Sequence, residues 1–120
     1  MTAERLLALP SIRREISRTK RRIAEISHKM EKAKDDPLLS FELSNQKALL
    51  CEYLRKEKSE ETVLLEFVNS IDDAYLREIF MLRYFDGIRT WQRVAFLSGE
   101  HDESYARRKH DTYLKKCQKN

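Results

Sequence analysis

A heptad pattern in the first third of the chain constrains the fold most strongly. Apolar or small residues recur at alternating spacings of four and three: Ile12, Ile16, Thr19, Ile23, Ile26, Met30 and Ala33. This spacing draws one stripe along an α-helix. Pro10 and Ser11 fit the start of that helix, with Pro10 in the first turn or Ser11 as the N-cap. The sequence DDPLL (residues 35–39) predicts its end, because Pro37 disfavours a helical conformation for Asp36.

The second segment is less regular but also favours helix. One heptad frame collects apolar residues at Leu43, Leu50, Leu54, Leu64, Val68 and Ile71, and charged residues interrupt it at Lys47, Glu57 and Glu61. Residues 56–61 are then either a solvated part of one long helix or a break, with Ser59 capping a new start. Either alternative predicts an antiparallel helical hairpin, because a short proline-containing turn joins the two segments.

Charge alternates along the chain, and this pattern supports the hairpin. Residues 1–34 hold 10 Lys and Arg against 4 acids, residues 35–73 hold 4 against 10, and residues 74–120 hold 10 against 6. Oppositely charged arms are expected to pair, although the apolar stripe must supply most of the energy. The basic excess of the first arm is thereby matched, which leaves the C-terminal segment with charge to offer a partner. With only two Gly and two Pro, an all-α protein is predicted.

Three helices are predicted in the C-terminal segment. Residues 74–85 form the first, with Asp72 or Asp73 as N-cap and Gly87 as its stop. Its inward side chains are expected to be Leu76, Ile79, Phe80, Leu82 and Phe85. Thr90 is expected to cap a short second helix over residues 91–97, whose inward side chains would be Trp91, Val94, Ala95 and Leu97.

Ser98 and Gly99 turn the chain into the last helix, which is predicted to begin at Asp102 or Ser104. Spacings of four, three and four put its inward side chains at Ala106, His110, Tyr113 and Cys117, flanked by Leu114. A short helix, a glycine-containing turn and a basic helix are the parts of a helix-turn-helix. The chain is therefore predicted to hold a hairpin arm over residues 1–70 and a helix-turn-helix domain over residues 71–120.

The last helix, about residues 103–116, is the predicted recognition helix of the DNA major groove. The side chains predicted to point away from the core are Ser104, Tyr105, Arg107, Arg108 and Asp111. Arg107 and Arg108 have the planar fork that suits guanine edges or phosphates, and Tyr105 suits a thymine methyl or a phosphate. The lysines expected to act as point charges toward the DNA backbone are Lys109, Lys115, Lys116 and Lys119.

A family resemblance rests on the run LREIFMLRYFDGIRTWQRVAFLSG, followed by SYARRKHDTYLKK. It resembles sigma-factor region 4, and most of all the phage and prophage transcriptional regulators of Gram-positive bacteria that carry a region-4-like helix-turn-helix. The resemblance covers about fifty C-terminal residues. It implies transcriptional regulation, a supporting helix that touches the DNA backbone through Thr90, Gln92 and Arg93, and recognition positions at Ser104, Tyr105, Arg107 and Arg108. The acidic turn GEHDE (residues 99–103) departs from this pattern.

Other chemistries find little support in the sequence. No glycine-rich phosphate loop, G-x-S-x-G or H-E-x-x-H occurs, so no enzyme and no cofactor are predicted. His28 is expected on a solvated face, His110 as a packed histidine, and His101 with Asp102 lacks metal partners. Cys51 and Cys117 fit no metal spacing and are expected to be reduced, partly buried thiols in a cytoplasmic protein. No membrane span or signal peptide is expected.

Two alternatives stay open at the level of sequence. The chain is a DNA-binding regulator, or it is a protein–protein adaptor that docks on RNA polymerase through the helical arm and binds no DNA. In addition, the heptad of residues 12–33 does not say whether its partner helix belongs to the same chain. An internal hairpin is favoured by the acidic second segment, and a homodimer is the other arrangement.

Overall fold

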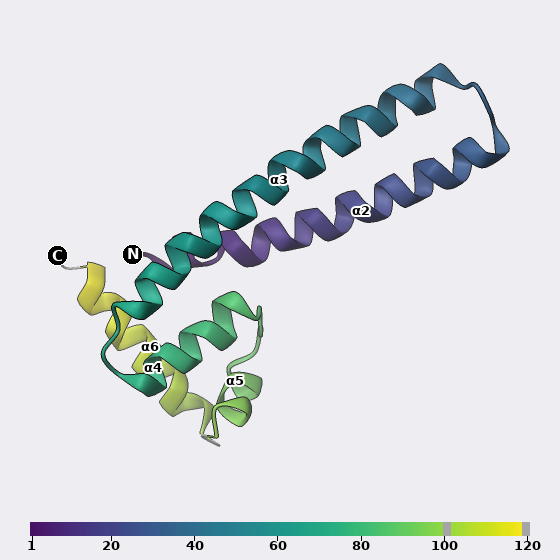
Figure 1. Ribbon diagram of the computed structural model, residues 1–120. Helices are drawn as coiled ribbons and strands as arrows, with labels where there is room; N and C mark the ends of the chain where they lie inside the picture. Colours follow the sequence, from purple (N-terminus) through teal and green to yellow (C-terminus); the bar gives the residue numbers. More distant parts are fainter. Residues whose placement is uncertain (100–101, 119–120) are drawn as a thin grey trace. The chain divides into compact units, whose positions relative to one another are not determined.

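The computed structural model describes residues 1–99 and 102–118, which fold into helices with no β-strand among them (Figure 1). The predicted all-α class is confirmed. The elements are α1 (Ala3–Leu6), α2 (Ala8–Lys32), α3 (Pro37–Asn69), α4 (Ala74–Phe80), the π-helix η1 (Met81–Phe85), α5 (Trp91–Leu97) and α6 (Glu103–Gln118). They belong to two compact units: the arm, Ser11–Ser59, and the C-terminal unit, which combines Met1–Pro10 with Glu60–Asn120.

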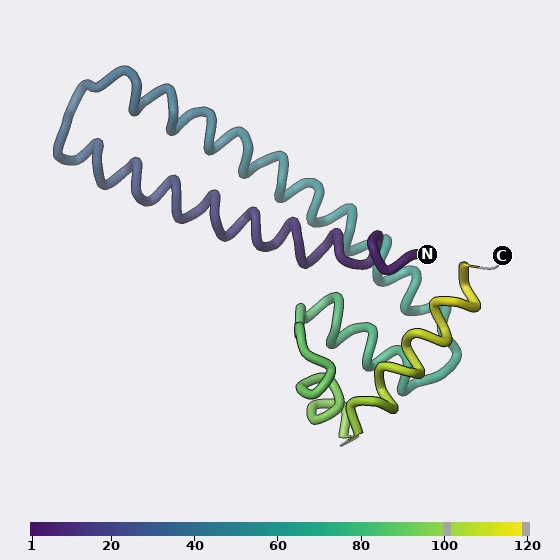
Figure 2. The backbone as a smooth tube through the Cα atoms, turned by 180° about the vertical axis from the view of Figure 1, so that it is seen from behind, coloured from purple at the N-terminus to yellow at the C-terminus, as the bar shows by residue number. Residues whose placement is uncertain are grey.

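In the arm, α2 and α3 run antiparallel side by side, as Figures 1 and 2 both show. Pro10 lies in the first turn of α2, whereas the alternative of Ser11 as N-cap is wrong because Ser11 is already helical. The helix ends at Lys32, before Ala33 of the predicted stripe. The chain then turns through a positive φ of 69° at Asp35.

Helix α2 ends shortly before DDPLL, and Asp36 is non-helical as predicted. Pro37 is the first residue of α3, a position that needs no backbone N–H donor. The Asp36 carboxylate accepts a hydrogen bond from the backbone N–H of Leu38 at 3.0 Å and so caps this helix. Of the two alternatives for residues 56–61, the long helix is correct, because α3 continues through Ser59 without a break.

The seam between the two helices is apolar at its centre and ionic at its sides. Ile16, Thr19 and Ile26 of α2 are buried, and the Thr19 hydroxyl donates to the carbonyl of Glu15 at 2.8 Å. Arg13 Nε lies 3.2 Å from Glu57 Oε2, and Arg22 pairs with Glu42. The expected pairing of basic and acidic helices is therefore present within the arm.

The predicted frame of α3 needs a correction. The half-buried positions in this part of the helix include Leu43, Gln46, Leu50, Tyr53 and Glu57, at spacings of three and four. Leu54, predicted on the stripe, is 38% exposed instead. Glu57, which looked like an interruption, faces the seam because Arg13 neutralises it there.

The C-terminal unit has a core that reaches beyond the predicted helix-turn-helix domain. Phe80 and Ile79 of α4 are fully buried, and they share one cluster with Leu64, Val68 and Ile71 at the end of α3. Leu6 and Leu9 from the N-terminus belong to the same cluster, at 3% and 2% exposure. The division of the chain therefore differs from the predicted boundary at residue 70.

Local signals set the ends of the C-terminal helices. Asp73 caps α4 by accepting from the N–H groups of Tyr75 and Leu76, and Thr90 caps α5 by accepting from that of Arg93 at 3.3 Å. Met81–Phe85 widens into a π-turn, which the predicted continuous helix over residues 74–85 did not include. Gly87 follows it at a φ of 74°, a left-handed conformation that favours glycine.

Candidate nucleic-acid interface

The site is built on α5 and α6, which pack against each other. Val94 and Ala95 of α5 and Ala106 of α6 are each at most 1% exposed. Small side chains let two helix backbones approach closely. Leu97, predicted to point inward, is 40% exposed, because it is the last residue of α5. Gly99, at a φ of 85°, turns the chain away from α5.

Helix α6 begins at Glu103, and Asp102 caps it, since its carboxylate accepts from the N–H of Ser104 at 2.9 Å. Ala106, His110 and Leu114 are buried and Tyr113 and Cys117 are half-buried, as the spacing predicted. The opposite face exposes the predicted reading residues Ser104, Tyr105, Arg107 and Arg108, together with Lys115 and Lys116. One side of α6 therefore fixes the helix, and the other side is available to a partner.

The charge on this outward face is largely unneutralised. Among residues 1–99 and 102–118, no carboxylate lies within ion-pair distance of Arg107, Arg108, Lys115 or Lys116. The Nε of Arg108 donates to the carbonyl of Ser104 at 3.2 Å, which orients the guanidinium along the helix. Asp111, the acid on this face, accepts from His110 instead.

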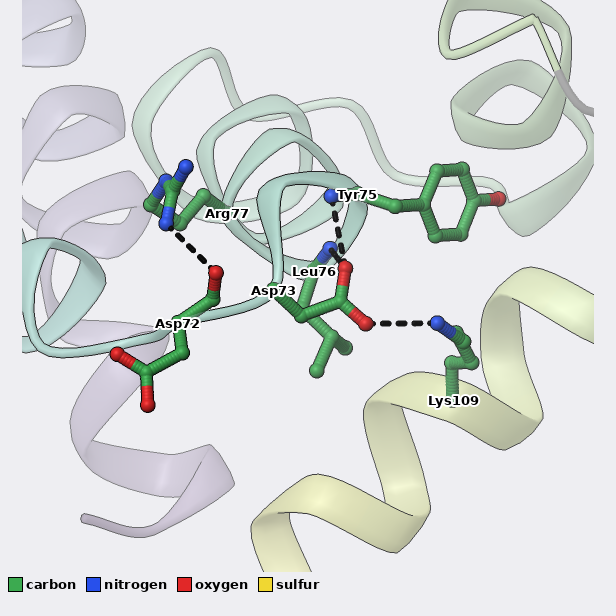
Figure 3. Close-up of polar contacts among 6 residues, drawn as sticks. All are labelled: Asp72, Asp73, Tyr75, Leu76, Arg77 and Lys109. Carbon is green, nitrogen blue, oxygen red and sulfur yellow. Dashed lines mark hydrogen bonds and ion pairs between the residues drawn. The ribbon is translucent and has the colours of Figure 1, made fainter.

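Lys109 differs from the other predicted phosphate-contacting lysines because it is bound within the unit (Figure 3). Its Nζ donates to Asp73 Oδ2 at 2.7 Å and lies 5.5 and 5.7 Å from the ring centroids of Tyr75 and Tyr105. The hydrogen bond from Lys109, followed by that from the N–H of Leu76, lowers the pKa of Asp73. The same bond raises the pKa of Lys109. Lys109 therefore holds α6 to the start of α4.

His110 anchors the centre of α6 in an aromatic cluster. Its ring stacks on Phe80 at 4.9 Å and contacts the edge of Trp91 at 4.7 Å. Its Nε2 is 2.5 Å from the hydroxyl of Tyr84, and its Nδ1 is 2.9 Å from Asp111 Oδ1. A carboxylate can only accept, so Nδ1 carries the proton and Nε2 accepts from the Tyr84 hydroxyl. The prediction that His110 is a packed, hydrogen-bonded histidine is confirmed.

The C-terminal unit is expected to become less stable as the pH is lowered below about 6.5, because of His110. Burial, more than any other cause, lowers the pKa of this imidazole from its usual 6.5. The unfolded chain consequently takes up a proton first as the pH falls, and the folded state loses up to about 1.4 kcal/mol per pH unit. Urea midpoints at pH 7.5 and 5.5 measure the loss.

The matched pair for this measurement is His110→Gln and His28→Gln. His28 has a side chain that is 65% exposed and lies 3.8 Å from Glu31. The His28 variant should retain the wild-type difference between the two pH values, and the His110 variant should lose most of it. An unchanged difference in His110→Gln would contradict the assignment.

The exposed face of α5 lies beside the same turn. Thr90, Gln92, Arg93 and Phe96 line a shallow hollow, so the supporting residues implied by the family resemblance are brought together. Phe96 is 63% exposed, and the predicted set did not include it. Phe96 could have been assigned to this face from the sequence, because it lies between Gln92 and Arg93 on a helical wheel.

Arg83 holds the segment that leads into α5. Its guanidinium carbon lies 4.6 Å from the centroid of the Trp91 ring, and Nη1 donates to the carbonyl of Arg89. Arg83 belongs to the run that carries the family resemblance, but its contacts with Trp91 and Arg89 were not predicted, because the π-turn brings these residues together. Glu100, His101 and Lys119 lie outside the described residues.

The remaining predictions concern ligands and other proteins. Cys51 and Cys117 are free thiols; Cys51 is exposed and not partly buried as predicted, because it lies on the outward face of α3. In the described part of the chain, no group of three or more His, Cys, Asp or Glu could hold a metal ion, and no helix has the length and apolarity to cross a membrane. Comparison with family models, curated proteins and solved structures found no match.

Proposed function

We propose that the protein is a sequence-specific DNA-binding transcriptional regulator, with α5 and α6 as a helix-turn-helix. The observation that carries the proposal is the two-sided construction of α6. Arg107 and Arg108 are exposed on one side, while Ala106 and His110 fix the other side in the core. A helix of this kind fits the major groove of B-DNA, which is about 12 Å wide.

The proposed reading positions are Arg107 and Arg108, with Ser104 and Tyr105 nearer the helix start. An arginine can donate two parallel hydrogen bonds to the O6 and N7 atoms of guanine. Tyr105 packs 5.8 Å from the ring of Tyr75, which limits its motion and directs it along one flank of α6. A pre-ordered ring loses little conformational entropy when it contacts a thymine methyl or a phosphate.

Phosphate contacts are assigned to residues at either side of the reading positions. Lys115 and Lys116 are exposed in the last turns of α6, and Thr90, Gln92 and Arg93 are exposed at the start of α5. Contacts of this type set the register on the duplex but carry no sequence information themselves. Lys109 contributes charge only from its place beside Asp73.

The resemblance to phage and prophage regulators with a sigma region-4-like helix-turn-helix supports a role in transcription. It rests on Leu82, Arg83, Tyr84, Gly87 and the Thr90–Trp91 pair. Of these, Arg83, Tyr84, Thr90 and Trp91 have structural tasks in the C-terminal unit: a cation–π contact, a hydrogen bond to His110 and a helix cap. The motif therefore describes how α5 and α6 are supported.

Selection of bound sequences from a random duplex pool, at stated salt, tests the proposal. We expect a recurring site, tighter binding to that site than to random duplex, and a log affinity that falls linearly with log salt. Duplex that is not enriched over the starting pool would overturn sequence-specific binding. Absence of any DNA binding, together with direct binding of purified RNA polymerase, would point to the adaptor instead. Sedimentation of the free protein determines whether it acts as a homodimer.

A further inference from the structure

The two units of the structure divide the charge differently from the segments of the sequence. The arm, Ser11–Ser59, holds 13 Lys and Arg against 8 Asp and Glu. The C-terminal unit holds 11 against 12. Several acids that had been matched with the first helix, including Glu60, Glu61 and Glu66, belong to the C-terminal unit. The arm is consequently the unit with the net positive charge.

Within the arm, the acids neutralise only some of the cations of α2. Arg13 and Arg22, at the seam, pair with Glu57 and Glu42 of α3. On α2 itself, Arg18 pairs with Glu15, and Arg22 also lies 3.4 Å from Glu25. The exposed cations of α2 that have no hydrogen-bond or ion-pair partner within the described residues are Arg14, Lys20, Arg21, Lys29 and Lys32.

Three of these free cations form a line, which we call the α2 ridge: Arg14, Arg21 and Lys32. A helix with 3.6 residues per turn places them within about 20° of one another, and about 120–160° around the helix from the buried residues Ile16 and Ile26. The ridge extends over about 27 Å, at a rise of 1.5 Å per residue. Ser17 is exposed between the two arginines and offers a small hydroxyl donor.

The ridge lacks the anchors that a protein partner would need. The exposed large apolar side chains of the described chain include none between Ser11 and Lys32. Energetically dominant positions in protein interfaces are mostly Trp, Tyr and Arg seated in desolvated pockets with apolar surroundings. Phosphate contacts, in contrast, need only cations and hydroxyl or amide donors. A nucleic-acid backbone therefore fits this surface better than an acidic protein does.

We propose that the α2 ridge is a second DNA contact, which binds duplex phosphates without reading their sequence. This inference rests on the proposed function of α6, which makes duplex DNA the partner of the chain. Arg14 and Arg21 would each neutralise a phosphate and release its condensed counterion. The ridge would add affinity to every duplex, and α6 would select among them.

The variant Arg14→Ala/Arg21→Ala in the full chain tests the proposal. Its binding to the selected site and to random duplex is measured by fluorescence anisotropy from 50 to 300 mM salt. We expect both affinities to fall by the same factor, and the slope of log affinity against log salt to become less steep by about 2. Lys47→Ala/Arg55→Ala removes two exposed cations of α3 and is the charge-matched control. Circular dichroism confirms that both variants are folded.

The outcomes separate this proposal from the function of α6. If the ridge variant has the same affinity and salt slope as the α3 control, the ridge is not a DNA contact. This holds even where the preference for the selected site over random duplex is intact. A second outcome separates the two sites. Here the wild-type protein binds all duplexes equally, Arg107→Ala/Arg108→Ala leaves the affinity unchanged, and only the ridge variant loses affinity. This outcome would support the ridge as a DNA contact and would contradict sequence reading by α6. A ridge variant that loses only the preference for the site would contradict its assignment as a sequence-independent contact.

Discussion

The double variant Arg107→Ala/Arg108→Ala should lose roughly 30-fold or more in affinity for the selected DNA site. Each well-placed bidentate contact to a base discriminates by about 1–3 kcal/mol, and two such losses correspond to at least about 2 kcal/mol. The reason lies in the position of the two side chains. Both are exposed on α6, and neither has a carboxylate partner among the described residues. Arg108 Nε donates to the carbonyl of Ser104, which leaves the terminal Nη groups of Arg108 to donate to DNA.

The fold should survive this change, because exposed substitutions usually alter stability by no more than about 0.5 kcal/mol. Anisotropy titrations with the selected site and with a scrambled duplex measure the effect, and thermal melts check the fold. Lys47→Ala/Arg55→Ala, which lowers the net charge equally, should retain the ratio between the two duplexes. An Arg107→Ala/Arg108→Ala variant that keeps this ratio would show that α6 does not read the bases.

Sequence alone predicted those parts of the fold that depend on neighbours a few residues away. The N-cap at Asp72 or Asp73, the Thr90 cap, the helix stop at Gly87 and the inward face of α6 all follow from spacings of two to four residues. Such signals act within one helical turn, and a helix of about sixteen residues shows its apolar period directly. The exposed face of the candidate site could therefore be predicted from the buried face opposite it.

The features that sequence did not predict depend on residues far apart in the chain. Glu57 looked like an interruption of the α3 stripe, because its partner Arg13 lies 44 residues away. Glu60 is a similar case, with its Oε1 3.0 Å from Arg5 of α1. At the site, Lys109 was predicted to contact phosphate, because its hydrogen-bond partner Asp73 lies 36 residues away in the sequence. The pattern of opposite charges indicates that ion pairs can form, but it does not indicate which residues pair.

The net charge of each unit could not be predicted from the sequence either. Segment counts depend on where the boundaries are drawn, and the fold draws them inside α2 and α3 rather than between helices. A helix can belong to two units because its own hydrogen bonds are local, while its side chains pack against different neighbours along its length. The net positive charge of the arm therefore depends on unit boundaries that only the fold defines.

Replacement of Leu9 by alanine should lower the stability of the C-terminal unit by about 2–5 kcal/mol, the usual cost of truncating a buried leucine. Leu9 is 2% exposed and lies in the cluster that holds Phe80, Ile79 and Leu114. Trp91 is the single tryptophan of the chain and belongs to the same unit, so its fluorescence during urea unfolding reports on this unit directly.

Leu38→Ala is the matched control for this prediction. Leu38 also lies in the first turn of a helix, but it is 77% exposed, and its truncation should change stability by no more than about 0.5 kcal/mol. Since a native domain is stable by only about 5–15 kcal/mol, the Leu9 variant should lose a large fraction of that margin and release DNA at a lower temperature. Equal urea midpoints for the two variants would show that the C-terminal unit folds without the N-terminal residues.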